Sequence, residues 1–314
     1  MAQRKNIMVN GVLTPVWQTD ATAQEIDDAA KKTAWQCNPN LLDNWYFVNP
    51  VNQRGQTSYS GAEYTVDRWK RYFSEQAGTT IISDGLHIVG KFGNLDQKIA
   101  PSEIASLRGR TVTMALLSRG NVGLIGEDAA YNYYQAYSNS AEPTITVLTF
   151  HVREDADSLV FHIQPQDGNE VVALAAKLEL GDQQTLAHKE GDAWVLNEIP
   201  DYGEQLRRCQ RYYYAPTLVW TYGYLTSSKT QVVGVVPFPV TMRANPVLVG
   251  TPTATYARTT AGGNVDVAAT AVSADTRPYA GIINFTTDMF SGSDYVNNTP
   301  MTLQINNSAF SADL

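Results

Sequence analysis

The sequence predicts a mainly β protein built from antiparallel sandwiches, and three observations carry that prediction. Apolar and polar residues alternate in short runs such as residues 111–116 (TVTMAL) and 146–150 (TVLTF), which is the pattern of a half-buried strand. Gly, Asn, Asp and Ser residues that favour turns separate these runs. Charged residues make up only 17% of the chain, and Thr, Ser, Asn, Gly and Tyr take their place, a composition typical of β structure.

Residues 1–38 are expected to form an attachment or oligomerisation segment. Asn10-Gly11 lies between apolar residues, and this is a strong signal for a β-hairpin. Thr22 and Glu25 form a capping box, so a helix is expected over residues 23–35. The apolar stripe of that helix is thin, and such a helix needs another chain or domain to cover it.

Residues 39–181 are expected to form an antiparallel jelly roll. Strands are predicted at residues 79–83, 86–89, 110–117, 144–153 and 159–164. Short strands at this spacing, with few helical patterns between them, favour a sandwich or jelly roll over a parallel sheet.

Residues 182–211 are expected to be a connector and residues 212–314 a C-terminal β-sandwich. Pro200 precedes a predicted short helix at 202–211, which we interpret as a solvated helix with one interface side. Strands are predicted at residues 217–221, 230–238, 247–250, 282–285 and 303–306. No internal repeat is present, so a solenoid or propeller is not supported.

Charge and hydropathy exclude several classes of partner. The net charge is −8 and the isoelectric point is about 5.0, which argues against nucleic acid and against anionic lipid as ligands. No apolar run approaches the roughly eighteen residues of a membrane span, so no membrane insertion is expected. No secretory signal is recognisable. Cys37 and Cys209 are expected to be free thiols, which fits folding in a reducing cytosol.

The sequence carries no catalytic motif, so the expectation is no catalytic residue, no metal ligand and no cofactor. No nucleophile elbow, phosphate-binding loop or zinc-protease helix occurs. His151 and His162 are expected on neighbouring strands as ordinary strand histidines, and Asp155 in the turn between them as a surface carboxylate. Glu127 and Asp128 are interpreted in the same way. A glycosidase carboxylate pair stays open, because its members need not be close in sequence.

Aromatic residues supply the candidate binding site. Trp45 and Trp69 are expected in the core, and Asp67 is expected to pair with Arg68 to stabilise a turn. Tyr residues flanked by amides suit sugars, because they offer a flat apolar face and nearby hydrogen-bonding groups. The alternatives are a buried Tyr row or a trimer contact, and loops at the end of a sandwich are the expected place of recognition. The candidate ligand-binding residues are Tyr131, Tyr133, Tyr134, Tyr137, Tyr279, Tyr295 and Asn297.

Three blocks of sequence resemble parts of one protein family. The blocks are residues 40–55 (NLLDNWYFVNPVNQRG) with 64–69 (YTVDRW); residues 176–181 (AKLELG), 199–206 (IPDYGEQL) and 209–213 (CQRYY); and residues 236–246 (VPFPVTMRANP). In this order they resemble phage tail-fibre and prophage structural proteins of gut bacteria. The resemblance implies a carbohydrate-binding-module-like jelly roll, a connector and a distal β domain, assembled as a trimer without catalytic residues.

Composition and resemblance together favour a bacteriophage virion protein, a tail fibre or receptor-binding protein that recognises host surface glycan without catalysis. Expected partners are further copies in a homotrimer, other virion proteins through the N-terminal segment, and the glycan. The protein is expected to be made in the bacterial cytoplasm and released by lysis. One alternative is a purely structural capsid decoration, head fibre or baseplate component; another is a polysaccharide-degrading tail enzyme. Whether calcium orders a loop is left open.

Overall fold

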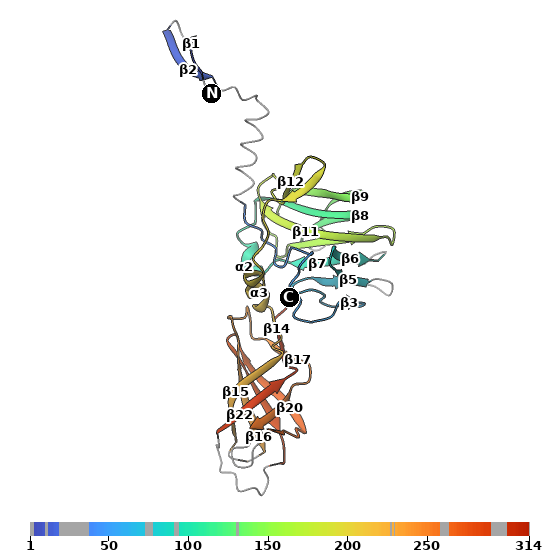
Figure 1. The fold of residues 1–314 in the computed structure, drawn as a ribbon, viewed down its shortest axis with the longest axis vertical. Helices are drawn as coiled ribbons and strands as arrows, with labels where there is room; N and C mark the ends of the chain where they lie inside the picture. The colour runs from blue at the N-terminus through green and yellow to red at the C-terminus, as the bar shows by residue number, and fades with distance from the viewer. Residues whose placement is uncertain are drawn as a thin grey trace.

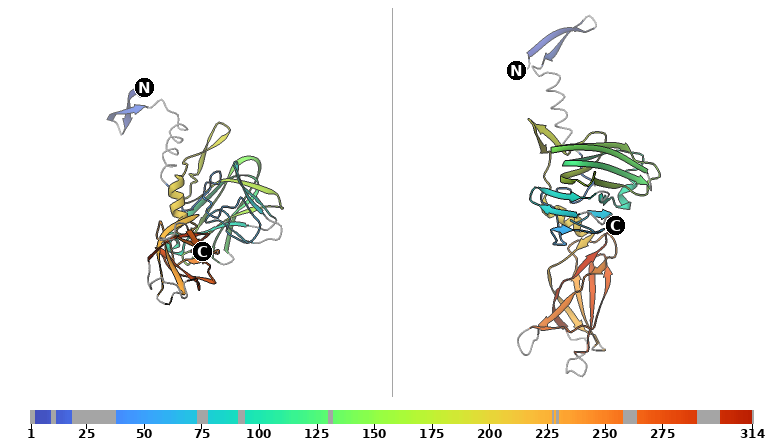
Figure 2. Two further views of the ribbon diagram at one scale, coloured as in Figure 1. Left: turned by 60° about the horizontal axis from the view of Figure 1, so that its bottom comes forward. Right: turned by 90° about the vertical axis from the view of Figure 1, so that its right-hand side faces the viewer.

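The computed structural model is dominated by antiparallel strands, which confirms the predicted fold class. It describes residues 3–9, 12–18, 38–72, 78–90, 94–129, 132–226, 228, 230–257, 264–289 and 300–313. Two β units follow one another along the long axis of the molecule, and each has its own hydrophobic cluster (Figure 1, Figure 2). No helix in these ranges is long and apolar enough to cross a membrane.

The N-terminal segment contains the predicted hairpin. Strand β1 (Gln3–Val9) pairs antiparallel with β2 (Val12–Gln18), and Val9 faces Val12 across the turn. Residues 10 and 11, where Asn-Gly predicts the turn, lie outside the described residues. The helix predicted at residues 23–35 lies outside the described residues.

The first β unit is built on a nine-stranded antiparallel sheet that curls into the predicted jelly roll. Its path runs through β3 (Ser58–Tyr59), β5 (Gly78–Ile82), β6 (Gly85–Val89), β11 (Glu170–Leu180), β8 (Thr111–Ala129), β10 (Val160–Pro165), β7 (Asn94–Lys98) and β4 (Lys70–Tyr72), with β9 (Asn132–His151) along β8. A short helix, α2 (Pro101–Ile104), follows β7.

Strand β8 belongs to both layers of this unit, because it bends at Gly120. Before the bend it pairs with β11, after the bend it pairs with β10, and β9 accompanies both halves. Gly120 has φ of 107°, and a Cβ there would lie 2.5 Å from the carbonyl oxygen of Glu170. Only glycine fits such a position. The strand predicted at 110–117 is therefore just the first half of β8.

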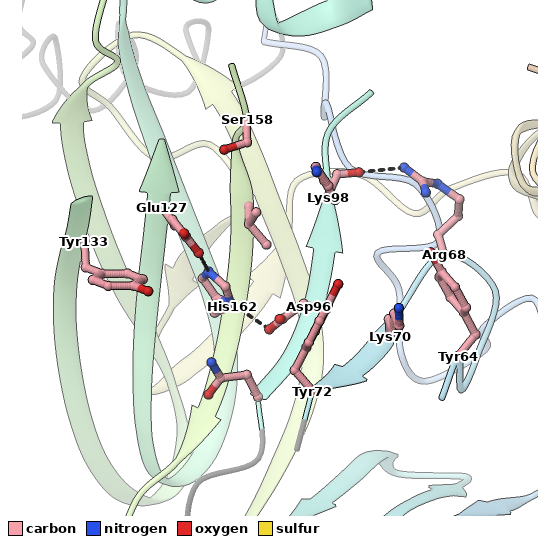
Figure 3. Close-up of a pocket in the computed structure, with 12 residues that line it drawn as sticks. Tyr64, Arg68, Lys70, Tyr72, Asp96, Lys98, Glu127, Tyr133, Ser158 and His162 are labelled. Atoms are coloured by element: carbon pink, nitrogen blue, oxygen red, sulfur yellow. Dashed lines mark hydrogen bonds and ion pairs between the residues drawn. The ribbon is translucent and has the colours of Figure 1, made fainter. Parts of the chain in front are cut away.

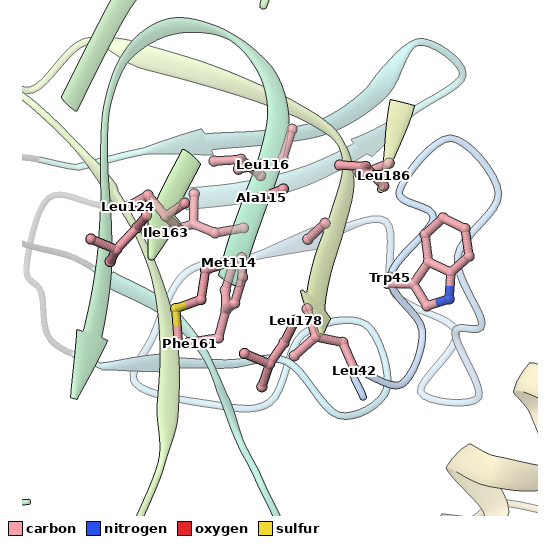
Figure 4. Close-up of a cluster of buried hydrophobic side chains, with 14 of the residues drawn as sticks. Leu42, Trp45, Met114, Ala115, Leu116, Leu124, Phe161, Ile163, Leu178 and Leu186 are labelled. Atoms are coloured by element: carbon pink, nitrogen blue, oxygen red, sulfur yellow. The ribbon is translucent and has the colours of Figure 1, made fainter. Parts of the chain in front are cut away.

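The core of the first unit contains Trp45 and Trp69, as the sequence predicts. Trp45 is 2% exposed and Trp69 is 0% exposed. The ring of Trp69 packs edge-on against Phe47 and Phe161, and its Nε1 donates a hydrogen bond to the carbonyl oxygen of Asn44 at 2.9 Å. Figure 4 shows how side chains from β8, β10 and β11 meet the loop that carries Trp45.

The second β unit contains a seven-stranded sheet and a three-stranded sheet. The larger sheet runs β19 (Asn264–Asp266), β18 (Thr253–Ala257), β22 (Pro300–Asn306), β15 (Leu218–Leu225), β16 (Gln231–Pro237), β21 (Ala280–Thr286) and β20 (Ala271–Arg277). The smaller one runs β14 (Tyr213–Tyr214), β23 (Ala309–Ser311) and β17 (Val247–Val249). A hairpin of β12 (Ala187–Glu190) and β13 (Ala193–Leu196) and the helix α3 (Tyr202–Gln210) link the two units.

Helix α3 packs its interface side against the loop that opens the first unit. Asp201 accepts a hydrogen bond from the backbone N–H of Glu204 at 2.8 Å and caps the helix. Gln205 accepts a hydrogen bond from the backbone N–H of Asn44 at 2.6 Å. Cys209 is a free, buried thiol, and burial raises its pKa well above the usual value. Cys37 lies outside the described residues.

The predicted pairing of Asp67 with Arg68 is wrong. Arg68 adopts a left-handed backbone with φ of 74°, and its guanidinium donates to Asp43 at 2.9 Å instead. Asp67 binds Arg54 at 3.0 Å, and Arg54 also binds Asp313 near the C-terminal end of the second unit at 2.6 Å. Arg54 therefore bridges the two units, and Asp43 also binds Arg208 of helix α3 at 2.7 Å. Asp67 and Arg68 each pair with a residue other than their neighbour.

Candidate functional site

A groove of about 320 Å³ lies on the face of the first unit formed by β4, β7, β10, β8 and β9 (Figure 3). The groove is lined by Tyr64, Arg68, Lys70, Tyr72, Asn94, Asp96, Lys98, Glu127, Tyr133, Ser158, Val160 and His162. Acidic, basic and aromatic side chains from distant parts of the chain therefore converge on one surface.

Strand register explains this convergence. Side chains at alternate positions of a strand share a face, and directly paired residues of neighbouring strands lie side by side on it. One row across the sheet pairs Lys70 with Asp96 and Asp96 with His162. The next row pairs Lys98 with Val160, Val160 with Glu127 and Glu127 with Tyr133. The two rows together supply the floor and both sides of the groove.

The floor contains a histidine between two carboxylates. The Nδ1 atom of His162 lies 2.7 Å from Oδ1 of Asp96, and both residues are about 5% exposed or less. Its Nε2 atom lies 3.2 Å from Oε2 of Glu127, an ion-pair distance without the alignment of a hydrogen bond. The imidazole is thus oriented by Asp96 and presents a second nitrogen toward the Glu127 side of the groove (Figure 3).

Burial and pairing shift the pKa values of His162 and Asp96 in opposite directions. Burial lowers the pKa of His162, but the hydrogen bond and charge of Asp96, together with Glu127, outweigh burial and raise the pKa above its ordinary value. Burial raises the pKa of Asp96 by more than the hydrogen bond and charge of His162 lower it. Because the pKa values of both groups are raised, Asp96 and His162 each keep a proton to higher pH than the isolated side chains would.

The sequence-based interpretation of these residues is wrong in three respects. His151 and His162 do not lie on neighbouring strands, because β9 and β10 flank opposite edges of β8. Glu127 is not an ordinary surface carboxylate, since it faces His162 in the groove. Asp128 is fully buried and accepts a hydrogen bond from the backbone N–H of Arg153 at 2.9 Å. Asp155 is exposed and pairs with Arg153, as expected of a surface carboxylate.

The rim of the groove is aromatic and basic. Tyr72 is 42% exposed and Tyr133 is 48% exposed, on opposite sides of the floor. The ammonium of Lys70 lies 4.8 Å from the ring centroid of Tyr72 and 5.5 Å from that of Tyr64. In the described part of the chain, neither Lys70 nor Lys98 has a carboxylate within ion-pair distance.

The predicted tyrosines separate in the structure. Tyr133 lines the groove, and Tyr137 is exposed on the same face of β9. Tyr134 points to the other face, where its ring stacks on Phe150 with centroids 4.2 Å apart. Tyr279 is 65% exposed in the turn between β20 and β21, far along the chain from the groove. Tyr131, Tyr295 and Asn297 lie outside the described residues.

A second surface that sequence reasoning missed lies on β15. Alternate residues of this strand project outward, and they are apolar or aromatic: Leu218, Trp220, Tyr222 and Tyr224. Tyr222 is 83% exposed. Thr302 and Gln304 of β22 pair with Tyr222 and Trp220, so uncharged polar groups border the stripe. The alternation was readable in the sequence as Leu-x-Trp-x-Tyr-x-Tyr, but its exposed side was not.

No protein-family model and no curated protein matches this chain. Among solved structures, the chain is similar to the N-terminal CBM22-1–CBM22-2 tandem domain of Paenibacillus barcinonensis Xyn10C, at 9% identity and a TM-score of 0.30, over 88% of this chain and 96% of that one. A triple jelly-roll turret protein of an archaeal virus is similar at 8% identity and a TM-score of 0.21, over 77% of this chain and 59% of that one. Within the described ranges, no group of three His, Cys, Asp or Glu residues is placed to hold a metal ion.

Proposed function

We propose that this protein binds a glycan in the groove of its first β unit, without cleaving it, as a tail-fibre or receptor-binding protein of a phage virion. The groove itself carries the proposal. Its exposed Tyr72 and Tyr133 rings suit the apolar faces of sugar rings, and its floor of Asp96, His162 and Glu127 suits their hydroxyls. The assignment to a virion rests on the resemblance of the sequence blocks.

The positions of those blocks support a common architectural role. The block at residues 40–55 meets the one at 199–206 where Asn44 contacts Gln205. The same block meets residues 209–213 where Gln53 donates a hydrogen bond to the carbonyl oxygen of Tyr213 at 2.7 Å. The resembling segments thus gather where the two β units join, which is consistent with a fixed spacing between an attachment end and a distal end.

The rings of the groove give the first test. Tyr133→Ala and Tyr72→Ala should each weaken glycan binding about three- to tenfold, because one aromatic contact is worth about 0.5–1.5 kcal/mol. Isothermal titration with a glycan first identified on an array, or with host surface polysaccharide, measures this. Tyr279→Ala removes an exposed ring of the second unit that does not line the groove, and it should leave affinity unchanged. Undiminished affinity in both groove variants would contradict the proposal.

Assembly into a homotrimer belongs to the same proposal, with the N-terminal segment contacting other virion proteins. The exposed stripe of β15 supports self-association, because contiguous apolar surface of this kind marks interaction sites. Light scattering should give about three times the 34.5 kDa mass of the chain. Tyr222→Lys should lower that mass, since a charge would be buried in the interface. A monomeric wild-type protein would argue against the assembly.

A polysaccharide-degrading enzyme is the second candidate, and one observation favours it. Buried, mutually perturbing titratable groups in a groove are a common feature of active sites, and Asp96, His162 and Glu127 form such a group. The glycan found by the array serves as substrate, and release of reducing ends is followed with time. A steady release that Glu127→Gln abolishes would replace the binding proposal with a catalytic one.

A further inference from the structure

The geometry points to an anionic sugar, one that carries a carboxylate or phosphate group, as the ligand that this groove selects. The inference rests on the proposed glycan binding, and it assigns the ligand's charge and its orientation. Three features of the groove carry it: two ammonium groups without a carboxylate at ion-pair distance on one side, the Asp96–His162 pair in the floor, and Glu127 on the other side of His162.

The unpaired ammonium groups belong to neighbouring strands. Lys70 on β4 pairs in register with Asp96 on β7, and Lys98 lies two residues beyond Asp96 on the same face. Such diagonal neighbours are roughly 7–8 Å apart, so both side chains can reach one anionic group. Neither has a carboxylate within ion-pair distance in the described ranges, although the chain as a whole carries a net charge of −8.

The remaining charges of the groove offset this pair only in part: Lys70 acts on the charge of buried Asp96, but His162 acts on it more strongly. Arg68 is bound to Asp43 at 2.9 Å and stacks on the ring of Tyr212, so it is compensated outside the groove. Asp96 is buried against His162, whose Nε2 atom is enclosed without a hydrogen-bond partner. A positive potential therefore persists on the β4 and β7 side.

Glu127 sets the orientation of the ligand. It lies on β8 beside Tyr133, across the floor from the two lysines. A carboxylate accepts hydrogen bonds from hydroxyl groups and repels an anion. The acidic group of the ligand is therefore placed between Lys70 and Lys98, and neutral hydroxyls face Glu127 while a sugar ring stacks on Tyr133.

Sugar pairs that differ only in charge provide the test. The pairs are a galacturonate tetrasaccharide with its carboxyl-reduced form, sialyllactose with lactose, and glucose 6-phosphate with glucose, each titrated into the full-length protein at low salt. At least one charged member should bind roughly three- to tenfold more tightly than its neutral partner, as exposed ion pairs allow. Added salt should shrink the difference. The pair that responds distinguishes carboxylate from phosphate.

Variants locate the preference on the two lysines. The double substitution Lys70→Gln with Lys98→Gln should bring the ratio of the charged-sugar affinity to the neutral-sugar affinity close to one. Lys189→Gln removes an exposed lysine of β12, outside the groove, and should keep the preference. Circular dichroism confirms that the variants are folded; if the double variant is not, Lys98→Gln alone should lose part of the preference.

The outcomes separate this inference from the proposed function. Equal binding of charged and neutral sugars that still falls in Tyr133→Ala would overturn the anionic preference and leave glycan binding intact. A charge preference that survives in the double lysine variant would place the anion site elsewhere and also overturn the inference. If no sugar binds in any pair and a glycan array stays blank, both the inference and the proposed function fail.

Discussion

Replacing Arg54 with Met is expected to destabilise the protein by about 3–5 kcal/mol, because it leaves buried carboxylates without their cation. Arg54 binds Asp67 at 3.0 Å and Asp313 at 2.6 Å, and its guanidinium lies 3.9 Å from the ring centroid of Tyr213. The Asp67 side chain is 1% exposed and the Asp313 side chain 8% exposed. Neither carboxylate can recover its lost partner from water.

The loss of stability in Arg54→Met should depend on pH in a defined direction. Burial, which outweighs Gln53 and Arg54, raises the pKa of Asp67 from 3.8 to about 6. A carboxyl group whose folded-state pKa exceeds its unfolded value binds its proton more tightly in the folded protein, so its contribution to stability declines as pH rises from about 4 through 6. Without Arg54 the pKa of Asp67 should rise further, so this decline should be larger and extend to higher pH. The Arg54→Met variant should therefore regain part of its deficit relative to the wild type between pH 7 and pH 5.

Urea denaturation at the two pH values measures both effects. Arg153→Met is the matched control, since it removes an arginine whose ion pair with Asp155 is exposed on both sides, and it should change stability little. An Arg54→Met variant as stable as the wild type at pH 7 would show that the ion cluster is not what joins the two β units. A deficit that grows toward pH 5 would contradict the assigned role of Asp67.

Trp69→Ala should cost about 3–5 kcal/mol of unfolding free energy, because it empties a large site in a packed core. The ring is fully buried between Phe47 and Phe161, and its Nε1 satisfies the carbonyl oxygen of Asn44. Trp69→Phe should cost less, since much of the ring contact is retained. Chemical denaturation of both variants gives the two free energies.

Trp220→Ala is the comparison that separates a core tryptophan from a surface one. Trp220 is 55% exposed on β15, so its loss should change monomer stability by no more than about 0.5 kcal/mol. Similar destabilisation by both substitutions would mean that the β15 face is covered in solution, which would favour the assembly proposed for it. Little effect of Trp69→Ala would place that ring outside the core.

The tyrosine-rich segment shows how much of the candidate site the sequence pattern could predict. Residues 131–137 (YNYYQAY) were interpreted as ligand-binding as a group. A strand turns consecutive side chains to opposite faces, and in β9 Tyr133 faces the groove while Tyr134 stacks on Phe150. This rule applies to the sequence alone, and it allows only one of two adjacent tyrosines on a strand to contact a ligand. Which tyrosine does so depends on which face of the strand packs against the core.

His162 is a groove residue whose partners the sequence pattern could not predict. It lies between the apolar residues Phe161 and Ile163, which is a common setting for an ordinary strand residue. Its partners Asp96 and Glu127 are distant in sequence and come from β7 and β8, on either side of β10. No local spacing signals such a cluster. The sequence analysis expects recognition at loop tips, whereas this groove lies on the sheet itself.

By itself, the sequence determined the features that depend on neighbouring residues. These are the mainly β fold class, the antiparallel pairing of residues 3–9 with 12–18, the helix after Pro200 and the burial of Trp45 and Trp69. Local backbone preferences and hydrophobic alternation decide them. Only the tertiary structure decided the groove, the ion clusters that join the units and the exposed face of β15. Each of these depends on strand register and on which side is covered, and those follow from packing over the whole chain.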